Sequence, residues 1–118
     1  MSEGYLTTHV LNTAQGIPAE GITVTAYRIA DGERQEVASM VTNHDGRTDS
    51  PILPVGSFPA GDYELVFHVD DYITSHFPEL GTPFFSSIPV PFTSSDADAH
   101  YHVPLLLSPY GYSTYRGS

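Results

Sequence analysis

The chain has 118 residues, contains no cysteine, and carries four arginines and no lysine against fourteen acidic residues, a formal net charge of −10. The missing cysteines exclude disulfides and thiolate metal sites. The acidic balance argues against binding to nucleic acid or to an anionic membrane, because both need a cationic surface. This length suits one domain, expected over residues 1–118, with an apolar core of its own.

Strand-like segments alternate with turn signals along the chain. The predicted strands are residues 5–11, 22–29, 36–43, 62–69, 86–92, 99–107 and 110–116. The Asp31-Gly32 pair predicts a tight hairpin, and Pro89 and Pro91 restrict their segment to a sheet edge or a bulge. The one helical segment is 70–77, which begins with aspartates and ends before Pro78. This pattern predicts an all-β, two-sheet β-sandwich of about eight strands with one short helix.

Because side chains alternate across a strand, two segments each divide into a core face and an outer face. The core face of the first segment is expected to hold Leu6, Thr8 and Val10. Its outer face then holds Tyr5, Thr7, His9 and Leu11. In the segment 99–107 the core face is expected to hold Tyr101, Val103, Leu105 and Leu107. The opposite face holds His100, His102, Pro104 and Leu106, a mixture that suits a cleft or a subunit interface.

The histidines also have a purely structural interpretation. A histidine in a strand is usually a surface residue or a hydrogen-bonded polar one, and three are expected to be structural or solvated: His44, His68 and His76. A metal site that uses His100, His102 and a neighbouring His9 is the chemical alternative. No HExxH spacing or compact cluster of His, Asp and Glu supports zinc, so no metal is expected.

Arginine is rare enough in this chain to be informative. An anionic substrate is expected to meet one of four residues: Arg28, Arg34, Arg47 and Arg116. Arg47 follows the Asp45-Gly46 turn, so its structural interpretation is that it decorates a loop or pairs with Asp45 or Asp49. The tyrosines Tyr110, Tyr112 and Tyr115 could equally be interface aromatics.

Three motifs, in order along essentially the whole chain, resemble the 5-hydroxyisourate hydrolase family. They are residues 6–14 followed by 16–19, residues 43–48, and residues 100–118, which end in Tyr-Arg-Gly-Ser. This family shares its fold with transthyretin. The resemblance implies an eight-stranded transthyretin-like sandwich and a homotetramer built as a dimer of dimers. It also implies active sites in a central channel, where the dimers meet.

The resemblance also implies a reaction and its residues. The reaction is the hydrolysis of 5-hydroxyisourate to 2-oxo-4-hydroxy-4-carboxy-5-ureidoimidazoline during urate breakdown, without a cofactor. The implied catalytic residues are His9, Arg47 and His102. The implied substrate-binding residues are Tyr115, Arg116, Gly117 and Ser118. Histidine suits this chemistry because its pKa of about 6.5 lets it exchange protons near neutral pH. His102 is favoured as the general base, and Arg47 as the group that holds developing negative charge.

A non-catalytic, transthyretin-like carrier of a small ligand is the alternative function. A carrier needs a mostly apolar channel and has no use for two histidines and an arginine, so the enzyme is favoured. The strand at 110–116 is expected to pair with the same strand of a second subunit. No targeting signal or membrane span is recognised, so a cytoplasmic location is expected, or a peroxisomal one if the source is eukaryotic.

Overall fold

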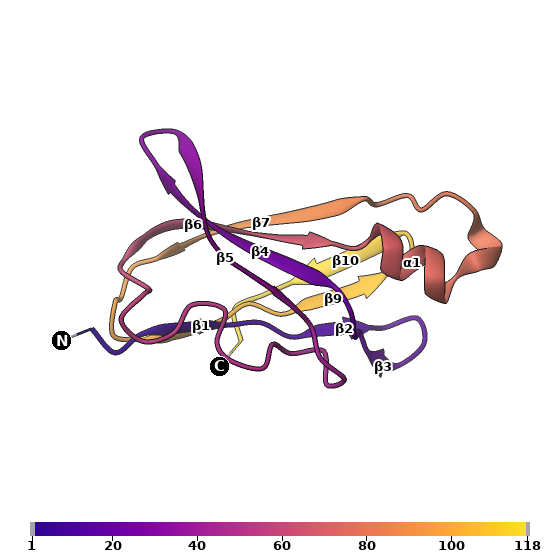
Figure 1. Cartoon of the computed structure of the whole chain (residues 1–118), viewed down its shortest axis with the longest axis horizontal. Helices are drawn as coiled ribbons and strands as arrows, with labels where there is room; N and C mark the ends of the chain where they lie inside the picture. The colour runs from indigo at the N-terminus through magenta and orange to yellow at the C-terminus, as the bar shows by residue number, and fades with distance from the viewer. Residues whose placement is uncertain (1, 118) are drawn as a thin grey trace.

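Two layers of β-strands packed face to face make up the computed structural model, which describes residues 2–117 (Figure 1). One sheet has the order β5-β4-β6-β7 and contains β4 (Thr23–Ala30), β5 (Glu33–Val41), β6 (Gly61–His68) and β7 (Ser87–Ser94). The other layer contains β1 (Tyr5–Thr7), β2 (Val10–Asn12), β3 (Ile17–Pro18), β8 (His100–His102), β9 (Leu105–Ser108) and β10 (Gly111–Thr114). The predicted all-β sandwich is confirmed.

In the second layer, β1 and β2 are two halves of one interrupted strand, and so are β8 and β9. Strand β1 pairs in parallel with β8, and β2 pairs in parallel with β9. The register is the same in both pairs, since Thr7 pairs with His102 and Val10 with Leu105. The ladder is interrupted at 103–104, where a proline has no N–H to donate, and the Thr8 hydroxyl donates to the Val103 carbonyl at 2.7 Å. The strands predicted at 5–11 and 99–107 are therefore each split in two. Counted as continuous, they leave eight strands within residues 2–117.

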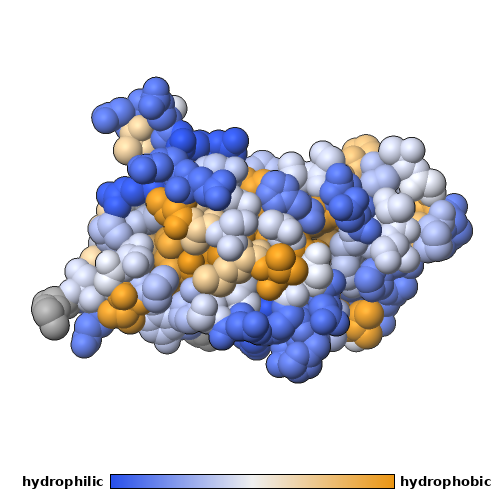
Figure 2. All heavy atoms as spheres, viewed as in Figure 1, coloured by the Kyte–Doolittle hydropathy of each residue, from blue (hydrophilic) through white to orange (hydrophobic). Residues whose placement is uncertain are grey.

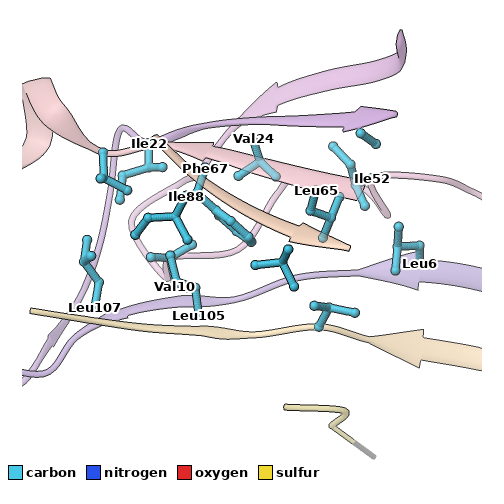
Figure 3. Packing of buried hydrophobic residues seen from close by; sticks show 14 of the residues in the cluster. Leu6, Val10, Ile22, Val24, Ile52, Leu65, Phe67, Ile88, Leu105 and Leu107 are labelled. Carbon is cyan, nitrogen blue, oxygen red and sulfur yellow. The ribbon is translucent and has the colours of Figure 1, made fainter. Parts of the chain in front are cut away.

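The core lies between the two layers and is lined from both sides (Figure 3). As predicted, the inward-facing residues of the interrupted strands are buried: Leu6, Thr8, Val10, Tyr101, Val103, Leu105 and Leu107. The outward-facing residues are half-buried: Tyr5, Thr7, His9, Leu11, His100, His102 and Leu106. Pro104 differs, because it lies on the outer side and is nevertheless buried. Period-two alternation thus sets the two histidine-bearing segments on one outer face.

The turns and edges follow the local sequence. Asp31 and Gly32 both have positive φ, 54° and 78°, which is the conformation of a tight hairpin turn. Helix α1 (Asp70–His76) begins as predicted and gives way to a 3₁₀ turn, η1 (Pro78–Leu80). Among the described strands, β7 pairs only with β6, so its prolines lie on an edge strand. Strand β10 ends at Thr114, two residues earlier than predicted, because Gly117 turns back to pair with His102.

The surface reflects this arrangement. In Figure 2 the protruding β4–β5 hairpin is largely hydrophilic, and apolar atoms gather on the central part of the same face. Within residues 2–117, no helix combines the length and the apolar character needed to cross a bilayer.

Candidate active site

His9 lies at the break between β1 and β2, directly beside the loop that carries Arg47. His9 and Arg47 form an isolated antiparallel β-bridge. Next to it, the Val10 amide donates to the Gly46 carbonyl at 2.8 Å. Gly46 has φ of 77°, and a Cβ there would collide with the Val10 carbonyl oxygen. A glycine is therefore required for the loop to lie against β2 and bring Arg47 next to His9.

The Arg47 loop is braced from within by Asn43. The Asn43 Oδ1 atom accepts from the backbone amides of Asp45 at 2.9 Å and Arg47 at 3.2 Å, while its Nδ2 donates to Asp49 Oδ1 at 2.9 Å. The salt bridges formed within residues 2–117 do not include Arg47. The interpretation that Arg47 pairs with Asp45 or Asp49 is therefore wrong, and its exposed guanidinium can meet a ligand.

His102 ends β8 and is held from two sides. Its Nδ1 atom lies 2.8 Å from Thr7 Oγ1, and the same hydroxyl lies 2.6 Å from His100 Nε2. The Gly117 amide donates to the His102 carbonyl at 2.7 Å. A Cβ on Gly117 would collide with the His102 ring. The segment that follows β10 therefore packs directly on this imidazole.

The charge of Arg47 influences the pKa of both His9 and His102. Burial, followed by the positive charge of Arg47, lowers the pKa of His9. The same two causes, in the same order, lower the pKa of His102, with smaller contributions from His100 and His9. Both imidazoles are therefore mostly neutral at pH 7 and able to accept a proton.

The hydrogen bond of His9 also fixes which nitrogen carries its proton. Its Nε2 lies 2.8 Å from the Asp45 carbonyl oxygen. A carbonyl only accepts, so Nε2 must be the N–H donor. Neutral His9 consequently has its free electron pair on Nδ1.

The residues predicted to bind substrate do not all lie beside the catalytic histidines. Gly117 lies against His102, whereas the Arg116 guanidinium lies 4.2 Å over the ring of Tyr101. Tyr115 is 56% exposed, and Ser118 lies outside the described residues. Arg116 and Tyr115 line a cavity of about 320 Å³, together with Val90, Phe92, Tyr101 and Val103. His9, Arg47 and His102 do not line this cavity.

The three histidines predicted to be structural or solvated are so. His44 is exposed, His68 Nε2 lies 3.2 Å from Thr25 Oγ1, and His76 stacks on Tyr72 with ring centroids 3.9 Å apart. In the described part of the chain, no three His, Cys, Asp or Glu side chains form a group that could hold a metal ion.

Three contributors to the site are not predicted by the sequence patterns: Thr7, Asn43 and the Asp45 carbonyl. Strand alternation places Thr7 on the outer face with His9, and His100 with His102. Only the parallel register of β1 and β8 shows that these two pairs meet.

A small β-sandwich with two imidazoles of lowered pKa beside a guanidinium has the groups that acid–base catalysis requires. The HIUase/Transthyretin family profile matches residues 6–117. The 5-hydroxyisourate hydrolase 2 of Rhizobium meliloti (strain 1021) is 53% identical over 116 residues, which are 98% of this chain and 97% of the relative. The chain belongs to the HIUase/Transthyretin family.

Solved structures from two branches of this family share the fold. The 5-hydroxyisourate hydrolase of Klebsiella pneumoniae superposes with a TM-score of 0.79 at 34% identity, covering 98% of this chain and 99% of that one. Sea bream transthyretin in complex with thyroxine gives a TM-score of 0.84 at 30% identity, covering 95% and 93%. Because both branches fit, the fold alone does not separate an enzyme from a ligand-binding protein, and the side chains of the site must do so.

Proposed function

We propose that this chain hydrolyses 5-hydroxyisourate to 2-oxo-4-hydroxy-4-carboxy-5-ureidoimidazoline in purine catabolism. The observation that carries the proposal is that His9 bridges to Arg47 on the outer face that also bears His102, where the charge of Arg47 helps to lower the pKa of both imidazoles. Identity of 53% to a hydrolase with that substrate in its name supports the same reaction.

The hydrogen bonds suggest a role for each group. Thr7 occupies Nδ1 of His102, which leaves Nε2 free to take a proton from water as that water attacks a ring carbonyl. His9 is fixed by the Asp45 carbonyl and offers Nδ1 to orient the water. The Arg47 guanidinium stabilises the negative charge that develops on the carbonyl oxygen. Breakage of the C–N bond then returns the proton to the leaving nitrogen, and no cofactor takes part.

The assembly that encloses this site is proposed to be a homotetramer, a dimer of dimers. In a single chain Arg47 is exposed and His9 and His102 are half-buried, and the outer edge of β10 has no strand partner within residues 2–117. Tyr110 and Tyr112 are 66% and 43% exposed. Pairing of β10 with its copy would satisfy the free edge with two-fold symmetry. Leu11 and Leu106 would then face the second dimer and line the channel.

We place this enzyme in the cytoplasm, where a cysteine-free chain is at no disadvantage.

Turnover with excess substrate separates the hydrolase from the carrier. Urate oxidase generates 5-hydroxyisourate in situ, and its absorbance is followed with the chain at about one hundredth of the substrate concentration. A hydrolase consumes all the substrate faster than the spontaneous decay. A carrier binds at most one equivalent per site and leaves the bulk decay unchanged, and that result would reject the proposal.

Replacing Arg47 by lysine is expected to lower kcat/KM at least about tenfold, because an ammonium cannot reproduce the bidentate donor fork, and single oxyanion donors are worth about 10²–10³. Steady-state kinetics on Arg47→Lys measure the effect. Arg34→Lys is the matched control, since Arg34 pairs with Glu64 on the sheet surface at 2.7 Å. Equal losses in both variants would remove Arg47 from the proposed site.

The pH dependence of kcat/KM is expected to show an acid limb with its midpoint below pH 6.5. The active forms of His9 and His102 are neutral, and lowered pKa values keep them neutral to lower pH. Activity is therefore present above the limb and lost as pH falls through it. In Arg47→Gln the midpoint should move back up, because a positive charge is gone. A midpoint at or above 6.5 in the parent chain would contradict these assignments.

Exhaustive treatment with a chelator is expected to leave the rate of 5-hydroxyisourate decay unchanged. The proposed steps use only imidazole and guanidinium groups, and residues 2–117 offer no metal-binding group of three ligands. The measurement compares the chelated protein with the same protein resupplied with zinc. Loss of activity on chelation and its return with zinc would contradict the mechanism.

A further inference from the structure

The Thr7 hydroxyl bridges two histidines on the outer face of the β1–β8 pair. It lies 2.6 Å from His100 Nε2 and 2.8 Å from His102 Nδ1, and the two rings are 6.1 Å apart. A hydroxyl has one hydrogen to donate, so at most one of the two nitrogens can accept from it. The proton positions on His100 and His102 are therefore linked through Thr7.

The two histidines at the ends of this bridge have different surroundings. The positive charge of Arg47 lowers the pKa of His102, and the neighbouring His100 and His9 add smaller contributions in the same direction. His100 instead stacks on Tyr5, with ring centroids 4.2 Å apart and planes inclined by 5°. The face of an aromatic ring attracts a cation within this distance. Tyr5 therefore offers an aromatic face to a positive charge that reaches the His100 ring.

We propose that Thr7 and His100 are positioning residues that connect to His102 as a proton relay. The inference rests on the proposed function, in which His102 takes a proton from water. As the water oxygen bonds to the ring carbonyl carbon, its proton passes to His102 Nε2. The Nδ1 proton of His102 passes to Thr7 Oγ1, and the Thr7 hydroxyl proton passes to His100 Nε2. The positive charge comes to rest on His100 under Tyr5, and the reverse transfers return the proton to the leaving nitrogen.

Kinetics on three variants test the relay. Thr7→Val removes the hydroxyl at nearly constant shape, and Thr7→Ser is its matched control. His100→Gln can still accept from Thr7 but cannot take up a proton. Thr7→Val and His100→Gln are each expected to lose about tenfold in kcat with little change in KM, whereas Thr7→Ser stays near the parent rate. If Thr7→Val does not fold, His100→Gln alone decides, because it alters a half-exposed side chain.

A proton inventory in H₂O–D₂O mixtures separates a relay from a merely structural role. The parent chain and Thr7→Ser should give curved plots of kcat against deuterium fraction, since several protons move together. Thr7→Val and His100→Gln should give straight lines, since one proton moves. Parent-like rates and parent-like curvature in both of those variants would overturn the relay.

Nitrogen-15 NMR of the histidine rings makes the test independent of catalysis. Neutral His102 should carry its proton on Nδ1 in the parent chain and lose that preference in Thr7→Val. If the parent chain fails to accelerate 5-hydroxyisourate decay, the proposed function fails, and this NMR result alone decides the Thr7 linkage. An Nε2–H tautomer of His102 in the parent chain, or a tautomer unaffected by Thr7→Val, would reject it.

Discussion

Asparagine in place of His102 is expected to reduce kcat/KM for 5-hydroxyisourate at least about tenfold, because a positioned general base contributes about 10²–10⁴. The asparagine side chain can place a polar atom where Nδ1 lies, so the contact with Thr7 is retained and only the proposed proton acceptor Nε2 is lost. The fold should survive, since His102 lies on the outer face and not in the core. Thermal unfolding and steady-state kinetics on the same preparation separate the two effects.

The equivalent variant for His9 is His9→Gln, because in His9 it is Nε2 that makes the hydrogen bond to the protein, at the Asp45 carbonyl. Glutamine can keep a donor to the Asp45 carbonyl while removing Nδ1. A loss of at least about tenfold is expected again. His44→Asn is the control for both variants, since His44 is exposed and outside the site. Near-parent turnover in His102→Asn or His9→Gln would remove that histidine from the mechanism.

Deletion of residues 115–118 is expected to harm catalysis far more than folding. These residues follow the last strand, β10, which stays anchored through the Thr114 hydroxyl bond to the Pro104 carbonyl at 2.8 Å. The deletion removes Gly117 from the face of His102 and should make the site more open, closer to a carrier. We expect at least about a tenfold loss of turnover, with the oligomeric mass unchanged by light scattering.

A single substitution separates loss of the whole segment from loss of the close contact between Gly117 and the His102 ring. In Gly117→Ala the added methyl group would meet the His102 ring, so the segment or the imidazole must move. We expect reduced turnover with the same mass as the parent chain. A fully active tetramer after the deletion would exclude the segment from the site. A monomeric parent chain would reject the proposed β10 interface.

Much of the fold follows from local sequence. Alternation over residues 5–11 and 99–107 predicts the buried faces correctly, because a sheet with one face in a core imposes a period of two. Asp31-Gly32 predicts a hairpin since both residues accept positive φ. The aspartates at 70 and 71 and the proline at 78 bound a helix that is one residue shorter than predicted.

The site depends on contacts that local patterns do not contain. Thr7 meets His102 only through the parallel register of β1 and β8, which lie 95 residues apart in the chain. His9 meets the Asp45 carbonyl only because Gly46 lets that loop touch β2. The early end of β10 likewise depends on the pairing of Gly117 with His102. From the sequence, the meeting of His9, Arg47 and His102 could be reached only through family resemblance.

One fold serves both the enzymes and the thyroxine-binding branch of this family, so the chemistry must lie in few side chains. This chain has two pKa-lowered imidazoles and a guanidinium on the outer face where its β1–β2 and β8–β9 strands are interrupted. Neutral bases beside a fixed cation suit the attack of water on a carbonyl, whereas an apolar ligand gains little from them.

Catalysis by the chain itself is tested by the first-order decay rate of freshly generated 5-hydroxyisourate at several concentrations of the purified protein. We predict a rate that rises in proportion to protein concentration from the spontaneous value, with a slope that falls at least about tenfold in His102→Asn. A decay rate that stays at the spontaneous value at every protein concentration would show that the chain is not a 5-hydroxyisourate hydrolase.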